Sequence, residues 1–295
     1  MSTARASRPG AAPYTERTPR VAAARGLTRR TGRDKAGRFL AEGVQAVREA
    51  LAWAAAGRGR VHEMFVTEPA AARHRDLLAA AEAAGVLVST VTERAAAGLS
   101  ETVTPQGIVA VCDPVDVPLA EALRGHPRLV AVLVGVADPG NAGTVLRVAD
   151  AAGADAVVFA GDSVDPHNGK CVRASTGSLF HPSVARCRDV GTVLAAAQAA
   201  GLRRLAADGH AERHLDAAED AGDLARPTAW VFGSEAHGLP GDVLAAVDGA
   251  LRVPIYGAAE SLNLATAAAV CLYASARAQR RGTGRAGADN RSRAS

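Results

Sequence analysis

Aromatic residues and cysteines are scarce in this sequence, and long apolar runs are missing. Phe, Trp and Tyr make up 3% of the 295 residues, although hydrophobic residues together reach 48%, so the core must be built mainly from Ala, Val and Leu. The four cysteines show no paired spacing, which argues against a zinc site or a disulfide framework. No apolar run approaches the roughly 20 residues that a membrane helix needs, and no signal peptide is recognisable. These absences predict a cytoplasmic protein with reduced thiols, no metal and no membrane association.

Positive charge is concentrated at the two ends of the chain. The net charge is +4, but residues 1–40 carry ten Lys and Arg residues against two acidic ones, and residues 277–295 carry six Arg residues against one acidic residue. The middle of the chain is therefore net negative. Basic ends on an acidic body suit a nucleic-acid partner. Residues 1–20 and 281–295 lack hydrophobic periodicity and are predicted to be disordered arms.

The apolar pattern between these arms predicts two α/β domains. Residues 21–113 form a small first domain, with strands expected at 39–40, 61–66, 86–91 and 108–112 and helices at 44–56 and 70–84. Residues 114–127 contain three prolines and are the expected linker. Residues 128–280 form the second domain, in which the apolar run 129–136 is typical of a strand buried on both faces of a parallel sheet. Its later elements are expected as helices at 144–152, 192–200 and 262–280 and strands at 156–159, 203–207, 229–232 and 251–255.

Two polar turns near the C-terminus follow two of these expected strands. The run 229–232 stops at Gly233, Ser234 and Glu235, and the run 251–255 stops before a stretch that leads to Ser261 and Asn263. Glycine lets the backbone approach a ligand closely, so such turns can hold the adenine and ribose of a nucleotide-like cofactor. The alternatives are a solvated acid at Glu235 and a plain helix N-cap at Ser261.

A third polar turn lies at residues 137–143, after the first strand of the second domain. Asn141 is expected near the start of the helix that follows, and Arg147 about one turn into it, where both could handle a phosphate or an oxyanion. An asparagine turn with a surface arginine explains the same residues equally well. The glycines of this turn also loosely match a dinucleotide-binding fingerprint, but their spacing and the proline between them make that match weak.

A fourth polar segment, residues 170–177, places Lys170 and Arg173 beside hydroxyl side chains and a glycine. Two cations with hydroxyl groups suit a ribose-phosphate backbone, and a solvated loop is the alternative. The basic residues Arg33, Lys35 and Arg38 of the first domain suit the same ligand.

The four segments together resemble the SpoU/TrmH family of RNA ribose 2′-O-methyltransferases. The resemblance is carried by DPGNAGTVLRVADAAGA at 138–154, KCVRASTGSLFHPSV at 170–184, VFGSEAHGLP at 231–240 and VPIYGAAESLNLATAAAVCLYA at 253–274. Residues 35–112 are similar to the substrate-binding domain that often precedes the methyltransferase domain. The resemblance covers residues 25–280.

The resemblance implies an α/β methyltransferase domain whose C-terminal segment is threaded into a trefoil knot, S-adenosylmethionine as cofactor, and a homodimer with the site built across its interface. It implies cofactor contacts from Gly233, Ser234, Gly238, Val253, Ile255 and Leu262, although position 253 is usually isoleucine. The resemblance places Arg147 at the motif arginine, which has been cast as the general base. Because a guanidinium keeps its proton, we expect Arg147 instead to hold phosphate and stabilise the attacking alkoxide. Orienting roles are implied for Asn141, Glu235, Ser261 and Asn263.

The first domain resembles that of the ribosomal-RNA branch of the family, which implies ribosomal RNA, here 23S, as the substrate. The alternatives are a tRNA methyltransferase and a catalytically inactive, ribosome-associated RNA-binding protein. A nicotinamide-dependent oxidoreductase is disfavoured by the loose glycine spacing. The sequence names neither the methylated nucleotide nor a housekeeping or antibiotic-resistance role.

Overall fold

The structure is a computed structural model that describes residues 12–292, and the chain divides into two compact units. The first unit comprises Met1–Val115 together with Asp165–His181, and the second comprises Asp116–Val164 together with Pro182–Ser295. Residues 165–181 therefore pack with the N-terminal part of the chain, although they lie in the middle of the predicted second domain. No helix among residues 12–292 is long and apolar enough to cross a membrane.

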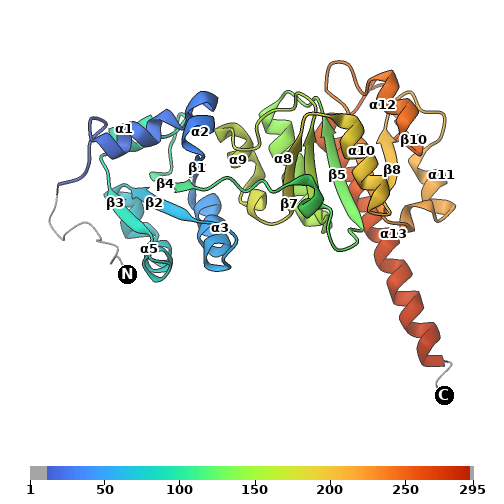
Figure 1. Ribbon diagram of the computed structural model, residues 1–295, viewed down its shortest axis with the longest axis horizontal. Helices are drawn as coiled ribbons and strands as arrows, with labels where there is room; N and C mark the ends of the chain where they lie inside the picture. Colours follow the sequence, from blue (N-terminus) through green and yellow to red (C-terminus); the bar gives the residue numbers. More distant parts are fainter. Residues whose placement is uncertain (1–11, 293–295) are drawn as a thin grey trace. The chain divides into compact units, whose positions relative to one another are not determined.

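The first unit is a four-stranded sheet with helices on both faces (Figure 1). The strand order is β1-β4-β2-β3, in which only β2 and β3 pair in parallel. Helices α3 and α5 pack on one face, while α1 and α6 share a hydrophobic cluster on the other. The elements are α1 (Pro19–Gly26), α2 (Arg30–Ala36), β1 (Phe39–Glu42), α3 (Val44–Ala55), β2 (Val61–Val66), α4 (Glu68–Arg73), α5 (Arg75–Ala83), β3 (Leu87–Thr90), α6 (Glu93–Gly98), β4 (Ile108–Cys112), α9 (Gly169–Ser175) and the 3-10 helix η1 (Ser178–Phe180).

The second unit contains a six-stranded sheet in the order β10-β8-β9-β5-β6-β7, and all its pairs are parallel. The predicted parallel α/β domain is thus confirmed. The elements are α7 (Leu119–Ala122), β5 (Leu129–Val134), α8 (Pro139–Ala152), β6 (Ala156–Ala160), β7 (Ser183–Cys187), α10 (Val190–Ala199), β8 (Arg203–Ala207), α11 (Leu215–Asp220), the 3-10 helix η2 (Asp223–Ala225), β9 (Thr228–Phe232), α12 (Gly241–Ala246), β10 (Gly249–Leu251) and α13 (Leu264–Ser292).

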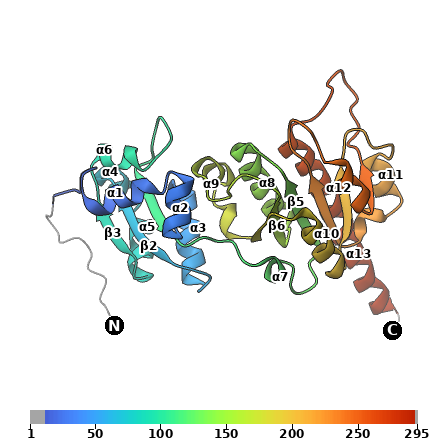
Figure 2. The ribbon, with the colours of Figure 1, turned by 45° about the horizontal axis from the view of Figure 1, so that its top comes forward.

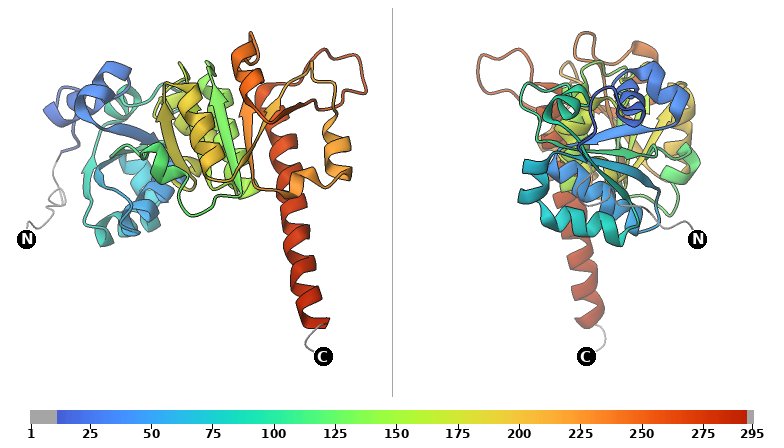
Figure 3. Two further views of the ribbon diagram at one scale, coloured as in Figure 1. Left: turned by 45° about the vertical axis from the view of Figure 1, so that its right-hand side comes forward. Right: turned by 90° about the vertical axis from the view of Figure 1, so that its left-hand side faces the viewer.

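Alternation along the central strand β5 explains the layers of this unit. Val130, Val132 and Val134 share one face and pack in a cluster with residues of α10, while the alternate residues of β5 point to the opposite face. Helices α8 and α13 pack against each other and against the sheet, whereas α10 contacts α7 and α12. Figure 3 shows α10 and α13 on opposite sides of the sheet. The small side chains expected from the composition thus fill a sheet covered on both faces.

Several element boundaries differ from the predictions. Tyr14 already pairs with Val91 and α1 begins at Pro19, so ordered structure starts before the predicted arm ends at residue 20. The expected helix 70–84 is two helices, α4 and α5, and the expected strand 251–255 ends at Leu251. Helix α13 continues to Ser292, past the predicted end at residue 280. Residues 1–11 and 293–295, at the ends of the predicted arms, lie outside the described residues.

Candidate active site

Three side chains from distant parts of the second unit form one hydrogen-bonded row beyond the carboxyl ends of β5 and β9. The Asn141 side-chain amide donates to Glu235 Oε1 at 2.9 Å, and the Asn263 amide donates to Asn141 Oδ1 at 3.0 Å. Glu235 comes three residues after β9, and β5 and β9 are parallel neighbours. In open α/β sheets the carboxyl ends of the strands are where ligands bind. The row thus joins the segments predicted to form the site.

Local capping places Asn141 in this row. Asp138 is the N-cap of α8 and accepts the backbone N–H of Asn141 at 2.8 Å, and Pro139 occupies the first turn, where its missing N–H costs nothing. Helix α8 therefore begins at Pro139 and not at residue 144 as predicted. Asn141 consequently lies in the first turn of the helix, with its amide available to Glu235.

The charge of Glu235 is stabilised by this arrangement. Partial burial by itself would raise the pKa of the Glu235 carboxyl, but hydrogen bonds from the Asn141 amide and from nearby backbone N–H groups outweigh it and lower the pKa. One of those groups is the N–H of Ala137, 3.4 Å from Oε2. An ionised Glu235 only accepts hydrogen bonds, so it requires the donor end of the Asn141 amide to face it.

Asn263 belongs to the row and also caps the last helix. Its Oδ1 accepts the N–H groups of Ala265 at 2.9 Å and Thr266 at 3.3 Å, while its amide donates to Asn141. Asn263, and not Ser261, therefore caps this helix, because α13 begins two residues later than expected. Ser261 is exposed, and in the described part of the chain its side chain makes no hydrogen bond.

Arg147 lies on α8 with an exposed side chain, six residues after Asn141. Six residues correspond to about 9 Å along the helix axis and a rotation of about 240°. The two side chains therefore start from different sides of the helix, and the expectation that both handle a phosphate or an oxyanion stays a prediction.

The glycine turn after β9 closes on itself. Ser234 and Gly238 exchange two backbone hydrogen bonds of 3.0 and 2.9 Å, and Gly238 has a positive φ of 65°. A side chain at Gly233 would lie 2.2 Å from the backbone carbon of Gly238, so only glycine allows this turn. Glu235 lies within this turn, between the two paired residues.

The segment between β10 and α13 has the opposite character, because it is an exposed loop (Figure 2). Within the described residues, the backbone of residues 253–262 makes no hydrogen bond to other backbone groups. Ile255 and Leu262 are 38% and 37% exposed, and Tyr256 is 88% exposed. Open backbone donors and acceptors next to aliphatic side chains fit a nucleoside-like cofactor that is bound through the main chain.

Two contacts that sequence reasoning missed attach this loop to α11. The Tyr256 hydroxyl donates to Asp216 at 3.0 Å, which raises the pKa of Tyr256, and the Arg252 guanidinium contacts the ring of His214. These pairs are about 40 residues apart in the sequence and carry no recognisable motif. No local signal could have found them.

The five cations predicted to bind RNA fall into two groups. Lys35, Arg38 and Lys170 are exposed. Arg33 is only 6% exposed and forms a 2.7 Å ion pair with Asp165, so the prediction that it contacts RNA is wrong, because its guanidinium is buried inside the first unit. Arg173 is partly buried and forms an ion pair with Glu42 at 2.9 Å, which occupies at least part of its guanidinium.

Residues 12–281, whose side chains the structure describes, contain no group of three or more His, Cys, Asp or Glu side chains that could hold a metal ion. The cysteines are free thiols, and burial raises the pKa of the Cys271 thiol to about 12.

Comparisons with known proteins agree with the motifs. The sequence model of the SpoU rRNA Methylase family matches residues 128–273, and the model for RNA 2′-O ribose methyltransferase substrate binding matches residues 40–118. The chain is 35% identical over 244 residues to the 23S rRNA (guanosine(2553)-2′-O)-methyltransferase RlmP of Bacillus subtilis, covering 82% of this chain and 89% of that protein. It is 34% identical over 209 residues to the 23S rRNA (guanosine-2′-O-)-methyltransferase RlmB of Ralstonia nicotianae, covering 70% of this chain and 82% of that protein.

Solved structures are similar over nearly the whole chain. An AdoMet-bound rRNA methyltransferase from Sinorhizobium meliloti has a TM-score of 0.76 at 29% identity, covering 88% of this chain and 95% of that one. The SpoU methyltransferase AviRb from Streptomyces viridochromogenes, in complex with AdoMet, has a TM-score of 0.74 at 28% identity, covering 90% of this chain and 100% of that one.

Proposed function

This chain belongs to the SpoU rRNA methylase family, and from that premise we propose that it methylates a ribose 2′-hydroxyl of 23S ribosomal RNA. It is an RNA 2′-O-ribose methyltransferase, and its cofactor is S-adenosylmethionine. The choice of 23S RNA rests on RlmP and RlmB, whose names state that substrate. A tRNA substrate remains the alternative, and an inactive RNA-binding protein is disfavoured by the intact Glu235–Asn141–Asn263 row.

That row is the single observation which carries the proposal at the level of the site. It links the turn after β5, the turn after β9 and the start of α13 through two hydrogen bonds of 2.9 and 3.0 Å. Both ends of the Asn141 amide are used, so the relative positions of three segments are set by one side chain. We therefore propose that Asn141, Glu235 and Asn263 fix the geometry of the site.

The residues present fit the cofactor. The backbone of 253–262 makes no backbone hydrogen bonds in the described residues, and the turn 233–238 offers a close approach at Gly238, where no atom lies within 4 Å of the position that a side chain would take. We propose that Gly233, Ser234 and Gly238 hold the cofactor on one side and Val253, Ile255 and Leu262 hold it on the other. When bound, S-adenosylmethionine supplies an activated methyl group on a positively charged sulfur.

Side chains of this protein must activate the ribose hydroxyl that attacks this methyl group. A ribose hydroxyl is a poor nucleophile until its proton is removed or its alkoxide is stabilised. A guanidinium stays positively charged in proteins and cannot accept a proton, so Arg147 is assigned an electrostatic role beside the developing oxyanion and an RNA phosphate. Ser261 is assigned a polar contact to the ribose, which its exposed position allows.

The RNA-binding surface is proposed on α2 and its flanks. Lys35 and Arg38 are exposed there, and the neighbouring Arg25, Arg29 and Arg30 are exposed as well. A cluster of exposed cations gives sequence-independent affinity for phosphates, whereas the choice of nucleotide needs contacts to bases. Lys170 is assigned to the same phosphate-binding role.

We also propose a homodimer, a trefoil knot and a cytoplasmic location. Val270 and Tyr273 on α13 are 39% and 45% exposed, and Leu262 lies just before the same helix. Leu262 directly precedes Asn263 in the chain, and we propose that a second copy covers these exposed side chains and completes the site. The packing of α13 against α8 is compatible with a threaded C-terminus, and the cytoplasm is where ribosomal RNA is available.

Transfer of tritium from S-adenosylmethionine to total RNA tests the activity. The account predicts label in ribosomal RNA and its loss in Arg147→Ala, with cofactor binding retained. An Arg147→Ala protein that binds the cofactor and transfers methyl groups at the full rate refutes the role of Arg147. Label in tRNA alone supports the alternative substrate.

A further inference from the structure

Residues 165–181 leave the sheet of the second unit after β6 and return to it at β7, but in between they pack in the first unit. The chain therefore passes between the two units at three points: after Val115, after Val164 and after His181. A protein whose domains are joined only by the proline-containing linker would cross once. The two additional crossings flank a segment that the RNA-binding unit holds.

A buried ion pair is the firmest anchor of this segment. Asp165 Oδ2 accepts Arg33 Nε at 2.8 Å and Nη2 at 2.7 Å, and both side chains are about 95% buried. Arg33 Nη1 also donates to the carbonyls of Leu27 and Thr28, each at 3.1 Å, and Asp165 Oδ1 accepts the His167 N–H at 3.0 Å. Burial would raise the pKa of Asp165, but hydrogen bonds from His167 and Arg33 lower it well below its usual range.

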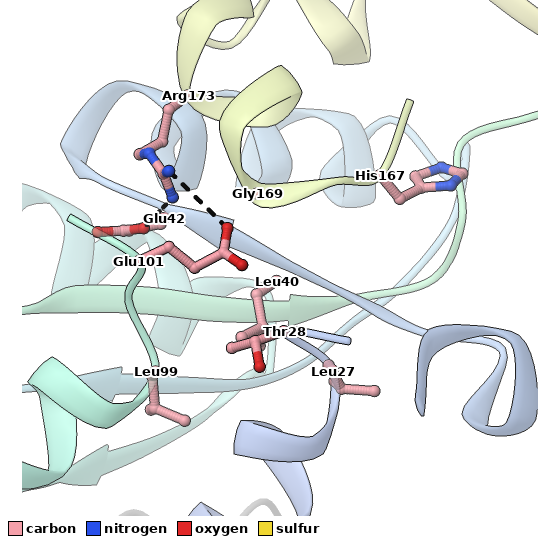
Figure 4. Close-up of a pocket in the computed structure, with 9 residues that line it drawn as sticks. All are labelled: Leu27, Thr28, Leu40, Glu42, Leu99, Glu101, His167, Gly169 and Arg173. Atoms are coloured by element: carbon pink, nitrogen blue, oxygen red, sulfur yellow. Dashed lines mark hydrogen bonds and ion pairs between the residues drawn. The ribbon is translucent and has the colours of Figure 1, made fainter. Parts of the chain in front are cut away.

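A second anchor lies one helix further along. Arg173 of α9 donates to Glu42 of β1 at 2.9 Å and approaches Glu101 at 3.8 Å, as Figure 4 shows. The 3-10 helix η1 adds an aromatic contact, because the ring of Phe180 lies 6.1 Å from Phe39 and 5.7 Å from Trp53. The whole segment is thus fixed to the RNA-binding unit by charges and by packing.

The residues just before Asp165 are fixed to the active-site turn. The N–H of Val164 donates to the carbonyl of Val136 at 2.9 Å, and Ser163 Oγ accepts the N–H of Val136 at 3.2 Å. The next residue, Ala137, is the one whose N–H points to Glu235. One peptide bond therefore separates the Arg33–Asp165 pair from a segment that holds the turn beside Glu235.

We infer that Arg33 and Asp165 are positioning residues for methyl transfer. Arg33 lies on α2, the helix that carries Lys35, so RNA held by α2 is connected through Asp165 and Val164 to the turn that precedes Asn141. The ion pair holds Asp165, and the adjoining residues 163–164 in turn hold Val136, which precedes the Ala137 N–H that points to Glu235. This inference rests on the proposed function, since it concerns the same reaction.

The test is the rate of a single turnover with RNA and cofactor both saturating. Asp165→Asn keeps the shape of the side chain and its acceptor for His167, but it removes the charge that holds Arg33. Misplacement of a reacting group by about 1 Å can cost on the order of 100-fold in rate, so we expect a loss of roughly 10- to 100-fold per folded molecule. The affinities for cofactor and for RNA, measured by equilibrium dialysis and filter binding, should stay within about threefold.

Asp76→Asn is the matched control, because Asp76 forms an exposed ion pair with Arg48 at 2.8 Å in the same unit. It should leave the rate unchanged. If Asp165→Asn does not fold, Arg33→Lys replaces it, since lysine keeps the charge but cannot hold Asp165 and two carbonyls together; it should lose rate in the same manner.

A purely structural ion pair gives a different result. The folded fraction would then fall, but each folded molecule would turn over at the wild-type rate, and this outcome overturns the inference while leaving the proposed function intact. A wild-type protein that transfers no methyl group to any RNA overturns both. Equal losses in the Asp76→Asn control also overturn the inference.

Discussion

Replacing Asn141 with aspartate should inactivate the site in a way that acid partly reverses. The substitution keeps the shape but turns the donor at 2.9 Å from Glu235 into a second carboxylate oxygen. Two unit charges at that distance repel by about 1.4 kcal/mol in water, and the lost hydrogen bond adds about 1 kcal/mol because Glu235 is largely exposed. Together these terms correspond to roughly 30- to 150-fold in rate if the row is needed in the transition state.

The pH dependence gives the sign of the effect. Hydrogen bonding lowers the pKa of Glu235 in the wild-type protein. The stability that the ionised Glu235 contributes is therefore fully present above the usual pKa of a glutamate, and it is lost only as the pH falls through the lowered pKa. In Asn141→Asp the two carboxylates raise the pKa of one of them, and a shared proton restores a hydrogen bond. The ratio of variant to wild-type activity should therefore rise as the pH falls from 8 toward 5.5.

Methyl transfer from tritiated cofactor to ribosomal RNA, measured across that pH range, is the assay. Gln198→Glu is the control, since it makes the same amide-to-acid change at an exposed position of α10. The reasoning is refuted if Asn141→Asp matches this control at pH 8, or if its activity relative to wild type does not change with pH.

Three further outcomes are expected. Lys35→Glu combined with Arg38→Glu should weaken RNA binding and reduce the slope of log affinity against log salt by about 0.7 to 0.9 per lost phosphate contact, while the cofactor affinity stays unchanged. Ser275→Ala should lower the free energy of unfolding, measured in urea, by about 1–3 kcal/mol, because the buried Trp230 N–H loses its 2.9 Å acceptor. Tyr273→Asp should shift the protein toward monomer in sedimentation experiments and reduce the rate, and an unchanged dimer would count against the proposed interface.

The fold of the second unit could be predicted from the sequence because its central strands are continuous apolar runs. The apolar run that becomes β5 and the short runs that become β6 and β9 are buried throughout, and the structure confirms a parallel sheet. Boundaries set by capping were harder to predict. Asp138 caps α8, which starts at Pro139, and Asn263 caps α13, which starts at Leu264, and the sequence pattern did not single out these caps among the neighbouring polar residues.

The site was only partly predictable for the same reason. The sequence pointed to Asn141, Glu235 and Asn263, and the structure brings these three together, although their catalytic roles stay predictions. Arg33 looked like one more exposed cation in a basic stretch, and nothing local marked it as buried, since its partner Asp165 is 132 residues away. A charge pattern describes composition, whereas burial depends on which distant segment packs against the charge.

The most direct test of the central claim is a map of 2′-O-methylated riboses in 23S ribosomal RNA from cells with and without this gene. The account predicts at least one methylated ribose that is lost with the gene and restored by the wild-type protein, but not by Arg147→Ala. An identical 23S map in both cells would contradict it, whether the gene changes methylation in tRNA or in no RNA.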